Sequence, residues 1–68
     1  MREVKNTRLI AARENAGLTK TELAKKVGVS VRMYQDYELN DCEPRVRIAN
    51  KIARVLGTTT ENIWEYEV

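Results

Sequence analysis

Histidine is absent from the 68-residue chain, and cysteine occurs once, at Cys42. A single thiol cannot form a disulfide within the chain, and without histidine there is no Cys/His cluster of the kind that holds zinc. The Ser–His and Cys–His pairs that serve nucleophilic catalysis are missing for the same reason. The composition therefore argues against an enzyme, a metal centre or a cofactor, and no small-molecule site is evident. Cys42 is expected to be a spectator thiol in a loop, and the alternative is a redox handle.

Long apolar runs are also missing. No stretch approaches the roughly 20 apolar residues that a membrane-spanning helix needs. The first residues, Met-Arg-Glu-Val-Lys-Asn-Thr-Arg, lack the apolar segment of a secretory signal peptide. We therefore expect a cytoplasmic protein with no membrane partner.

Proline occurs once and glycine three times, whereas Ala, Leu, Val, Ile, Lys, Arg and Glu are abundant. Such a composition favours helices, and the length suits one small domain that covers residues 1–68. The predicted fold class is therefore all-α.

Residues 20–39 are predicted to form two short helices, over 20–27 and 31–39, joined by a tight turn. Gly28 adopts a positive φ at no steric cost and ends the first helix, and Ser30 caps the second. Six apolar positions would meet across the angle between them: Leu23, Ala24, Val27, Val29, Tyr34 and Tyr37. Two helices joined by a three- to four-residue turn with a glycine form the helix-turn-helix arrangement.

Three further helices are predicted around this motif. Asn6 or Thr7 caps a helix that runs to about Ala16, and Thr19 with Glu22 forms a capping box at the start of helix 20–27. A fourth helix over 46–56 follows a proline loop and ends at a glycine, with these residues on its apolar side: Val46, Ala49, Ile52, Ala53 and Leu56. Thr59 caps a last short helix that ends near Trp64.

The C-terminal residues 64–68 alternate apolar and acidic side chains with the period of a strand. Residues 2–5 include Arg2 and Lys5, which complement the glutamates of that tail. Two alternatives follow: a small two-stranded pairing of the N- and C-termini, or a frayed tail with Trp64 alone packed against the domain.

The net charge of +2 is unevenly distributed. Residues 1–54 hold all twelve basic and seven acidic residues, a net charge of +5, whereas residues 55–68 hold three glutamates and no base. A basic body suits contact with a polyanion such as a nucleic acid, but a solvated surface of mixed charge has the same composition.

The predicted helices and their spacing resemble the phage-repressor and Cro-like DNA-binding family, often called the XRE-type helix-turn-helix. The resemblance covers about residues 6–64 and is carried by these residues: Leu18-Thr19, Glu22-Leu23-Ala24, Val27-Gly28-Val29-Ser30, Tyr37-Glu38, Glu43-Pro44, Ile52-Ala53 and Leu56-Gly57. It implies a compact five-helix, lambda-repressor-like domain that binds double-stranded DNA with helix 31–39 in the major groove.

By position, the resemblance implies base contacts by Val31, Arg32, Gln35 and Asp36. Arg32 is the main candidate, because a guanidinium can bond both O6 and N7 of guanine. Val31 suits a thymine methyl group, and Gln35 suits a base or a phosphate. Asp36 either accepts from a cytosine amino group or excludes other sequences by its charge. The alternative for all four is a solvated helix face.

The resemblance also implies contacts to DNA phosphates by five residues: Thr19, Lys20, Ser30, Arg45 and Arg47. The family commonly has glutamine where Lys20 stands, so the geometry of that contact differs here. It often has a serine or threonine cap where Arg45 stands, which implies a weaker start for helix 46–56.

Two positions are implied to be structural. An arginine of the first helix pairs in the family with a glutamate near the end of the recognition helix, which gives Arg13 and Glu38 here; the alternative is two independent surface charges. Tyr34 stands where the family is usually aliphatic, and we expect a core tyrosine with its hydroxyl at the rim rather than a residue that stacks on DNA.

One recognition helix reads few base pairs, so a homodimer on a palindromic operator is expected. Ile63, Trp64 and Tyr66, in the C-terminal region 60–68, are the expected interface; the alternative is that they only close the core. The favoured function is a sequence-specific transcriptional repressor. The second hypothesis is an antitoxin or another protein-interaction module whose DNA binding is autoregulatory.

Overall fold

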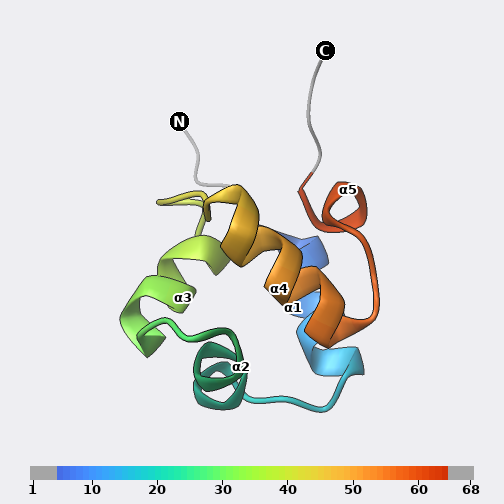
Figure 1. The fold of residues 1–68 in the computed structure, drawn as a ribbon, viewed down its shortest axis with the longest axis horizontal. Coiled ribbons are helices and arrows are strands. Elements are labelled where there is room, and N and C mark those ends of the chain that lie inside the picture. Colours follow the sequence, from blue (N-terminus) through green and yellow to red (C-terminus); the bar gives the residue numbers. More distant parts are fainter. Residues whose placement is uncertain (1–4, 65–68) are drawn as a thin grey trace.

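The computed structural model describes residues 5–64, which form five α-helices (Figure 1). They are α1 (Thr7–Asn15), α2 (Lys20–Val27), α3 (Val31–Glu38), α4 (Val46–Leu56) and α5 (Thr60–Ile63). The predicted all-α class is confirmed, and α1, α3 and α5 each end one residue earlier than expected. The suggested pairing of the termini falls mainly on residues 1–4 and 65–68, which lie outside the described residues.

Polar side chains begin the first three helices. The Asn6 side chain accepts a hydrogen bond from the backbone N–H of Leu9 at 3.0 Å. The Thr19 hydroxyl oxygen accepts from the N–H of Glu22, whose carboxylate accepts in turn from the N–H of Thr19, so the predicted capping box is present. Ser30 accepts from the N–H of Met33 at 3.0 Å. These caps place each helix start where the sequence predicts it.

The turn of the motif depends on Gly28, whose φ of +83° ends α2 in the left-handed region. Its N–H and that of Val29 both reach back to the carbonyl of Ala24, at 2.9 and 3.0 Å. Asn40, with φ +61°, plays the corresponding part after α3. Both turns satisfy helix-end carbonyls within a few residues, so α2 and α3 each end abruptly.

One hydrophobic core joins all five helices. Its fully buried side chains come from four elements: Leu9, Leu23, Val27, Tyr34 and Ile52. Helix α2 packs against α3 and α4, and α1 packs against α3 and α5. The prediction that Val46 lies on the apolar side of α4 is wrong, because this first residue of the helix is 77% exposed. It precedes the turn at which α4 first meets the core.

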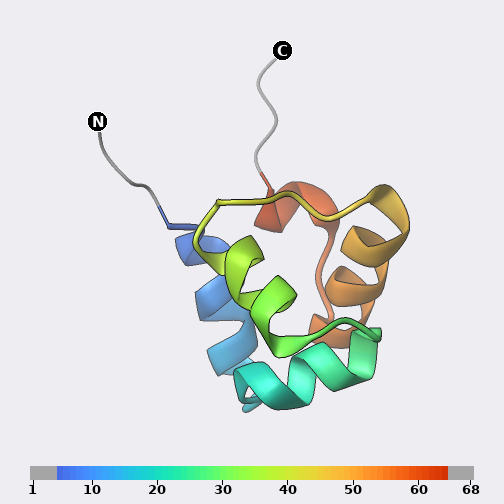
Figure 2. The same cartoon turned by 90° about the vertical axis from the view of Figure 1, so that its left-hand side faces the viewer.

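In Figure 1, α3 lies at the left-hand side of the molecule and α5 at the right. Figure 2 shows the molecule from the side of α3, so this helix faces the viewer. Helix α4 crosses in front of α1 in Figure 1 and packs directly against α2. The fold thus leaves one side of α3 open to solvent. Within residues 5–64, no helix has the length and apolar character needed to cross a bilayer.

Candidate nucleic-acid interface

Helix α3 turns one side to the core and the other to solvent. Tyr34, Tyr37 and Glu38 are buried, whereas Val31, Arg32 and Gln35 are exposed and Asp36 is half-buried. The four predicted base contacts stand at i, i+1, i+4 and i+5, so a helix of 3.6 residues per turn gathers them on one side. None of the four is used to close the core.

The Arg32 side chain makes no hydrogen bond or ion pair with any residue in the described range 5–64. Its guanidinium therefore keeps all its donors for a partner outside the domain. Met33, next to it, is 40% exposed and was not among the predicted base contacts. Sequence reasoning passed over it because an apolar residue in an amphipathic helix is normally assigned to the core.

The start of α2 offers donors to an anion. Thr19 already uses its hydroxyl oxygen and its backbone N–H in the capping box, at 3.1 and 2.9 Å. The hydroxyl proton of Thr19 and the backbone N–H groups of Lys20 and Thr21 remain, since the first N–H groups of a helix have no partner within it. The Glu22 carboxylate at the same end repels an anion, and the charge of Lys20 opposes that repulsion.

The starts of α3 and α4 differ from each other. Ser30 caps α3 through its oxygen and keeps its hydroxyl proton for donation. Arg45 stands at the N-cap of α4 and makes no side-chain capping bond, as the resemblance implied. Arg45 and Arg47 are both exposed. The uncapped N–H groups of α4 and these two cations therefore lie together at one helix end, which favours a negative charge.

The Arg13–Glu38 ion pair implied by the resemblance is present. The Nε of Arg13 donates to Oε2 of Glu38 at 2.7 Å, with side-chain exposures of 11% and 4%. The same oxygen accepts from the hydroxyl of Tyr34 at 2.5 Å, and Nη1 of Arg13 donates to the carbonyl of Leu18 at 2.9 Å. Tyr34 is fully buried, so the expectation that its hydroxyl lies at the rim is wrong. The hydroxyl stays inside because the buried carboxylate supplies a partner there.

Burial and this network shift several pKa values. Burial, followed by the hydrogen bond to Glu38, raises the pKa of Tyr34 far above its usual range, so the hydroxyl remains a donor. Burial alone would lower the pKa of Arg13, but the hydrogen bond and charge of Glu38 raise it on balance. Burial, with a smaller effect of Cys42, raises the pKa of Tyr37.

Residues 9–63 match the family described as Helix-turn-helix, and this match spans most of the chain. The chain belongs to that family. An uncharacterised HTH-type transcriptional regulator of Archaeoglobus fulgidus is 38% identical over 90% of this chain and 87% of its own length. A second uncharacterised HTH-type transcriptional regulator, from Methanocaldococcus jannaschii, is 40% identical over 74% of this chain and 76% of its own.

Among solved structures, the P22 c2 repressor in complex with a synthetic operator is similar to this chain with a TM-score of 0.84 and 20% identity. The similarity covers 97% of this chain and the whole of the repressor chain. The clp gene regulator ClgR from Corynebacterium glutamicum matches over 85% of this chain (TM-score 0.78, 22% identity), which spans 62% of that protein. At these identities the likeness shows the fold, which is that of the repressor domains. The family and the sequence relatives are DNA-binding transcriptional regulators and not enzymes.

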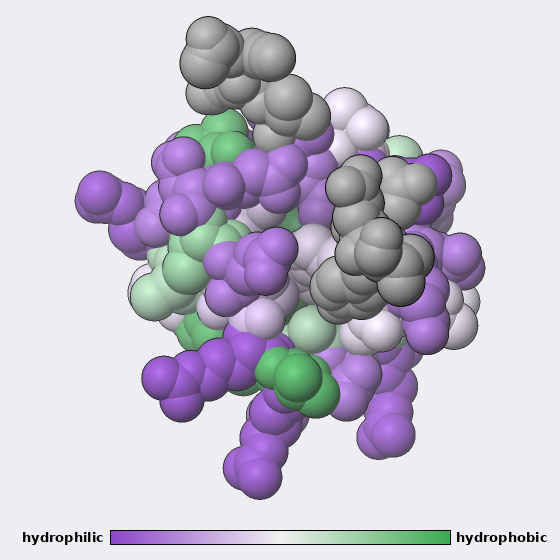
Figure 3. All heavy atoms as spheres, turned by 90° about the horizontal axis from the view of Figure 1, so that it is seen from above, coloured by the Kyte–Doolittle hydropathy of each residue, from purple (hydrophilic) through white to green (hydrophobic). Residues whose placement is uncertain are grey.

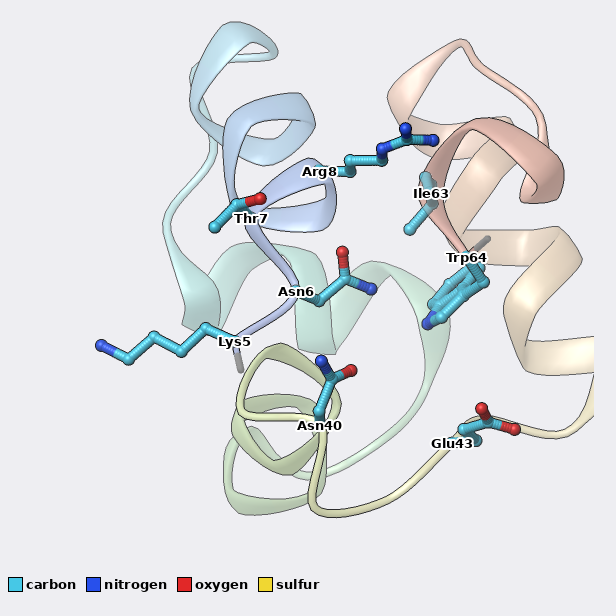
Figure 4. Close-up of a pocket in the computed structure, with 8 residues that line it drawn as sticks. All are labelled: Lys5, Asn6, Thr7, Arg8, Asn40, Glu43, Ile63 and Trp64. Carbon is cyan, nitrogen blue, oxygen red and sulfur yellow. The ribbon is translucent and has the colours of Figure 1, made fainter. Parts of the chain in front are cut away.

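The structure places the predicted interface residues Ile63 and Trp64 in the core of this helix-turn-helix domain. They are 2% and 7% exposed, in agreement with the alternative that they close the core. Tyr66 lies outside the described residues. Both line a partly open cavity of about 410 Å³ between the start of α1, the loop after α3 and the end of α5 (Figure 4). In Figure 4, Arg8 extends from α1 towards Ile63, and Lys5 points away from the cavity.

Cys42 is an exposed free thiol, as expected. Within residues 5–64, no three Cys, Asp or Glu side chains cluster closely enough to hold a metal ion. Figure 3 shows one face covered mainly by hydrophilic side chains, with hydrophobic ones isolated between them. Scattered apolar residues are ordinary on a protein surface and do not form a patch.

Proposed function

We propose that this protein represses transcription by binding a specific sequence of double-stranded DNA, with α3 inserted in the major groove. The observation that carries the proposal is the solvent-facing side of α3, where Arg32, which has no partner within residues 5–64, stands among Val31, Gln35 and Asp36. A domain seated in the groove blocks other proteins from the same site, so repression is the expected consequence. Its place of action is the cytoplasm, where a reducing environment keeps Cys42 a thiol.

The proposed contacts divide into two kinds. Arg32 reads guanine, and Val31, Gln35 and Asp36 refine the choice of neighbouring bases. Thr19, Lys20 and Ser30 hold the phosphate backbone on one flank of α3, and Arg45 and Arg47 hold it on the other. Base contacts supply sequence choice, whereas phosphate contacts supply affinity that falls as salt is added.

A homodimer on a palindromic operator is part of the proposal, because two recognition helices double the number of base pairs that are read. The buried Ile63 and Trp64 support the core of each subunit, so any contact through region 60–68 relies on its other residues. Sedimentation of the chain with and without Tyr66→Ala tests this directly. A chain that stays monomeric even on its selected DNA would remove the homodimer from the proposal.

The deciding experiment is selection of bound duplexes from a random pool, followed by affinity measurements on the selected sequence. Arg32→Ala should lose about 1–3 kcal/mol of discrimination against a changed guanine, because one bidentate contact is removed. Arg45→Ala should weaken binding to all duplexes alike and reduce the salt dependence. Arg54→Ala, at the opposite end of α4, is the matched control. Failure to enrich any sequence, or an Arg32→Ala variant that discriminates as well as the natural chain, would overturn the proposal.

A further inference from the structure

Arg13 connects two parts of the proposed interface. Its Nε–H reaches Glu38 in the last turn of α3, and its Nη1–H reaches the carbonyl of Leu18. Leu18 directly precedes Thr19, the N-cap of α2. Because the guanidinium is planar and rigid, its two donors fix these two acceptors relative to each other. The end of the recognition helix and the start of α2 are therefore tied through one side chain.

This tie needs a carboxylate held in one orientation. The terminal torsion of a glutamate is broad, so Glu38 by itself would present either oxygen to Arg13 at several angles. The Tyr34 hydroxyl, one turn earlier on α3, donates to the same Oε2 that Arg13 uses. The Tyr34 ring is fully buried and packs edge-on against Tyr37, with the ring centres 6.3 Å apart. A rigid ring thus fixes the hydroxyl, and the hydroxyl fixes the carboxylate.

We propose that the Tyr34 hydroxyl is a positioning group for DNA recognition, which holds α3 at a set orientation to the start of α2 through Glu38 and Arg13. The inference rests on the proposed function, since it concerns how bases and phosphates are engaged together. Without the hydroxyl, the buried core is preserved but the orientation of α3 is less narrowly defined. Base contacts depend steeply on donor distance and angle, whereas phosphate contacts by flexible cations do not.

The test compares Tyr34→Phe with Tyr37→Phe, which removes a hydroxyl from the same helix. The Tyr37 hydroxyl makes no hydrogen bond with a described residue, and its ring is 5% exposed, so it is a matched control. The probes are a duplex selected by the natural chain and a scrambled duplex of the same composition. Tyr34→Phe should lower the ratio of the two affinities about tenfold, the effect of one hydrogen bond to a charged group. Tyr37→Phe should leave the ratio unchanged.

If the Tyr34 hydroxyl only stabilised the fold, its loss would lower the folded fraction of the protein. Both affinities would then fall equally, and their ratio would not change. A second readout is the exchange of the Arg13 Nε proton, followed by NMR, which should quicken in Tyr34→Phe and not in Tyr37→Phe. An unchanged affinity ratio in Tyr34→Phe, an equal fall in both variants, or failure of Tyr34→Phe to fold would each overturn the inference. If the natural chain itself shows no preference for any duplex, the proposed function fails and the inference falls with it.

Discussion

Replacing Arg13 with alanine removes the cation that faces the buried carboxylate of Glu38. Glu38 is 3% exposed, and its Oε2 would keep only the hydrogen bond from Tyr34. The carbonyl of Leu18 would lose the Nη1 donor at the same time. The perturbation therefore leaves an uncompensated charge in the protein interior, which is more costly than the loss of a surface pair.

The size of the effect follows from this burial. Breaking a buried ion pair by removing one partner costs about 3–5 kcal/mol, and we expect the lower end because the Arg13 side chain retains 11% of its exposure. Domains of 68 residues have a free energy of unfolding of about 3–10 kcal/mol. A loss of about 3 kcal/mol lowers Tm by about 12–24 °C in a domain of this size. Arg13→Ala should therefore be close to the limit of folding.

Urea unfolding followed by the fluorescence of Trp64 measures this loss, since this is the one tryptophan in the chain and it is 7% exposed. Arg32→Ala is the control, because Arg32 is an exposed arginine without a partner in the described residues. It should change the free energy of unfolding by less than about 0.5 kcal/mol. Adding Glu38→Gln to Arg13→Ala should recover part of the loss by removing the unpaired charge. Equal stabilities for Arg13→Ala and Arg32→Ala would refute the reasoning.

Three other predictions concern local features. Gly28→Ala should lower the free energy of unfolding by about 1–2 kcal/mol, measured from the urea midpoint. The cause is the φ of +83°, since a Cβ at this position would meet no atom within 4 Å. Gly28→Asn should lose less, because asparagine tolerates this conformation better. Arg45→Ser should raise the free energy of unfolding by about 1 kcal/mol, because the serine side chain can cap the start of α4. The same variant should bind DNA more weakly at low salt. An unchanged free energy of unfolding would show that the uncapped start of α4 costs nothing. Folding raises the pKa of Tyr34, so the folded state holds the phenolic proton more tightly than the unfolded state does. The stabilisation that this gives the folded state is complete at pH values below 10.0, the ordinary pKa of tyrosine, and is lost as the pH rises above it. Urea midpoints above that pH should fall less in Tyr34→Phe than in the natural chain, although Tyr37 contributes in the same direction.

Much of the local structure of the candidate interface was predictable from sequence because it is built from local signals. The caps at Thr19 and Ser30 and the turn at Gly28 each act over a few residues, so the limits of α2 and the start of α3 follow from residue types. The side of α3 that carries Arg32 follows from helical spacing once the motif is recognised. The predicted roles of these residues on DNA stay predictions.

The errors arise where exposure depends on neighbours far along the chain. Val46 has the residue type and spacing of a core position, yet α4 meets the core only after its first turn. For Ile63 and Trp64 the apolar character left two roles open, an interface or the core, and in the structure α1 and α4 pack against α5 and both side chains are buried. A sequence pattern identifies which side of an element is apolar and leaves open what lies against it.

By itself, the sequence determined the five helices, their caps and the helix-turn-helix geometry, since hydrogen bonds and backbone preferences over a few residues are sufficient for these. The resemblance added the Arg13–Glu38 pair. Only the tertiary structure decided that Tyr34 joins that pair from inside the core and that Trp64 is buried. Tyr34 and Glu38 are only four positions apart, but packing decides that both side chains are buried and meet Arg13, which is 25 positions from Glu38.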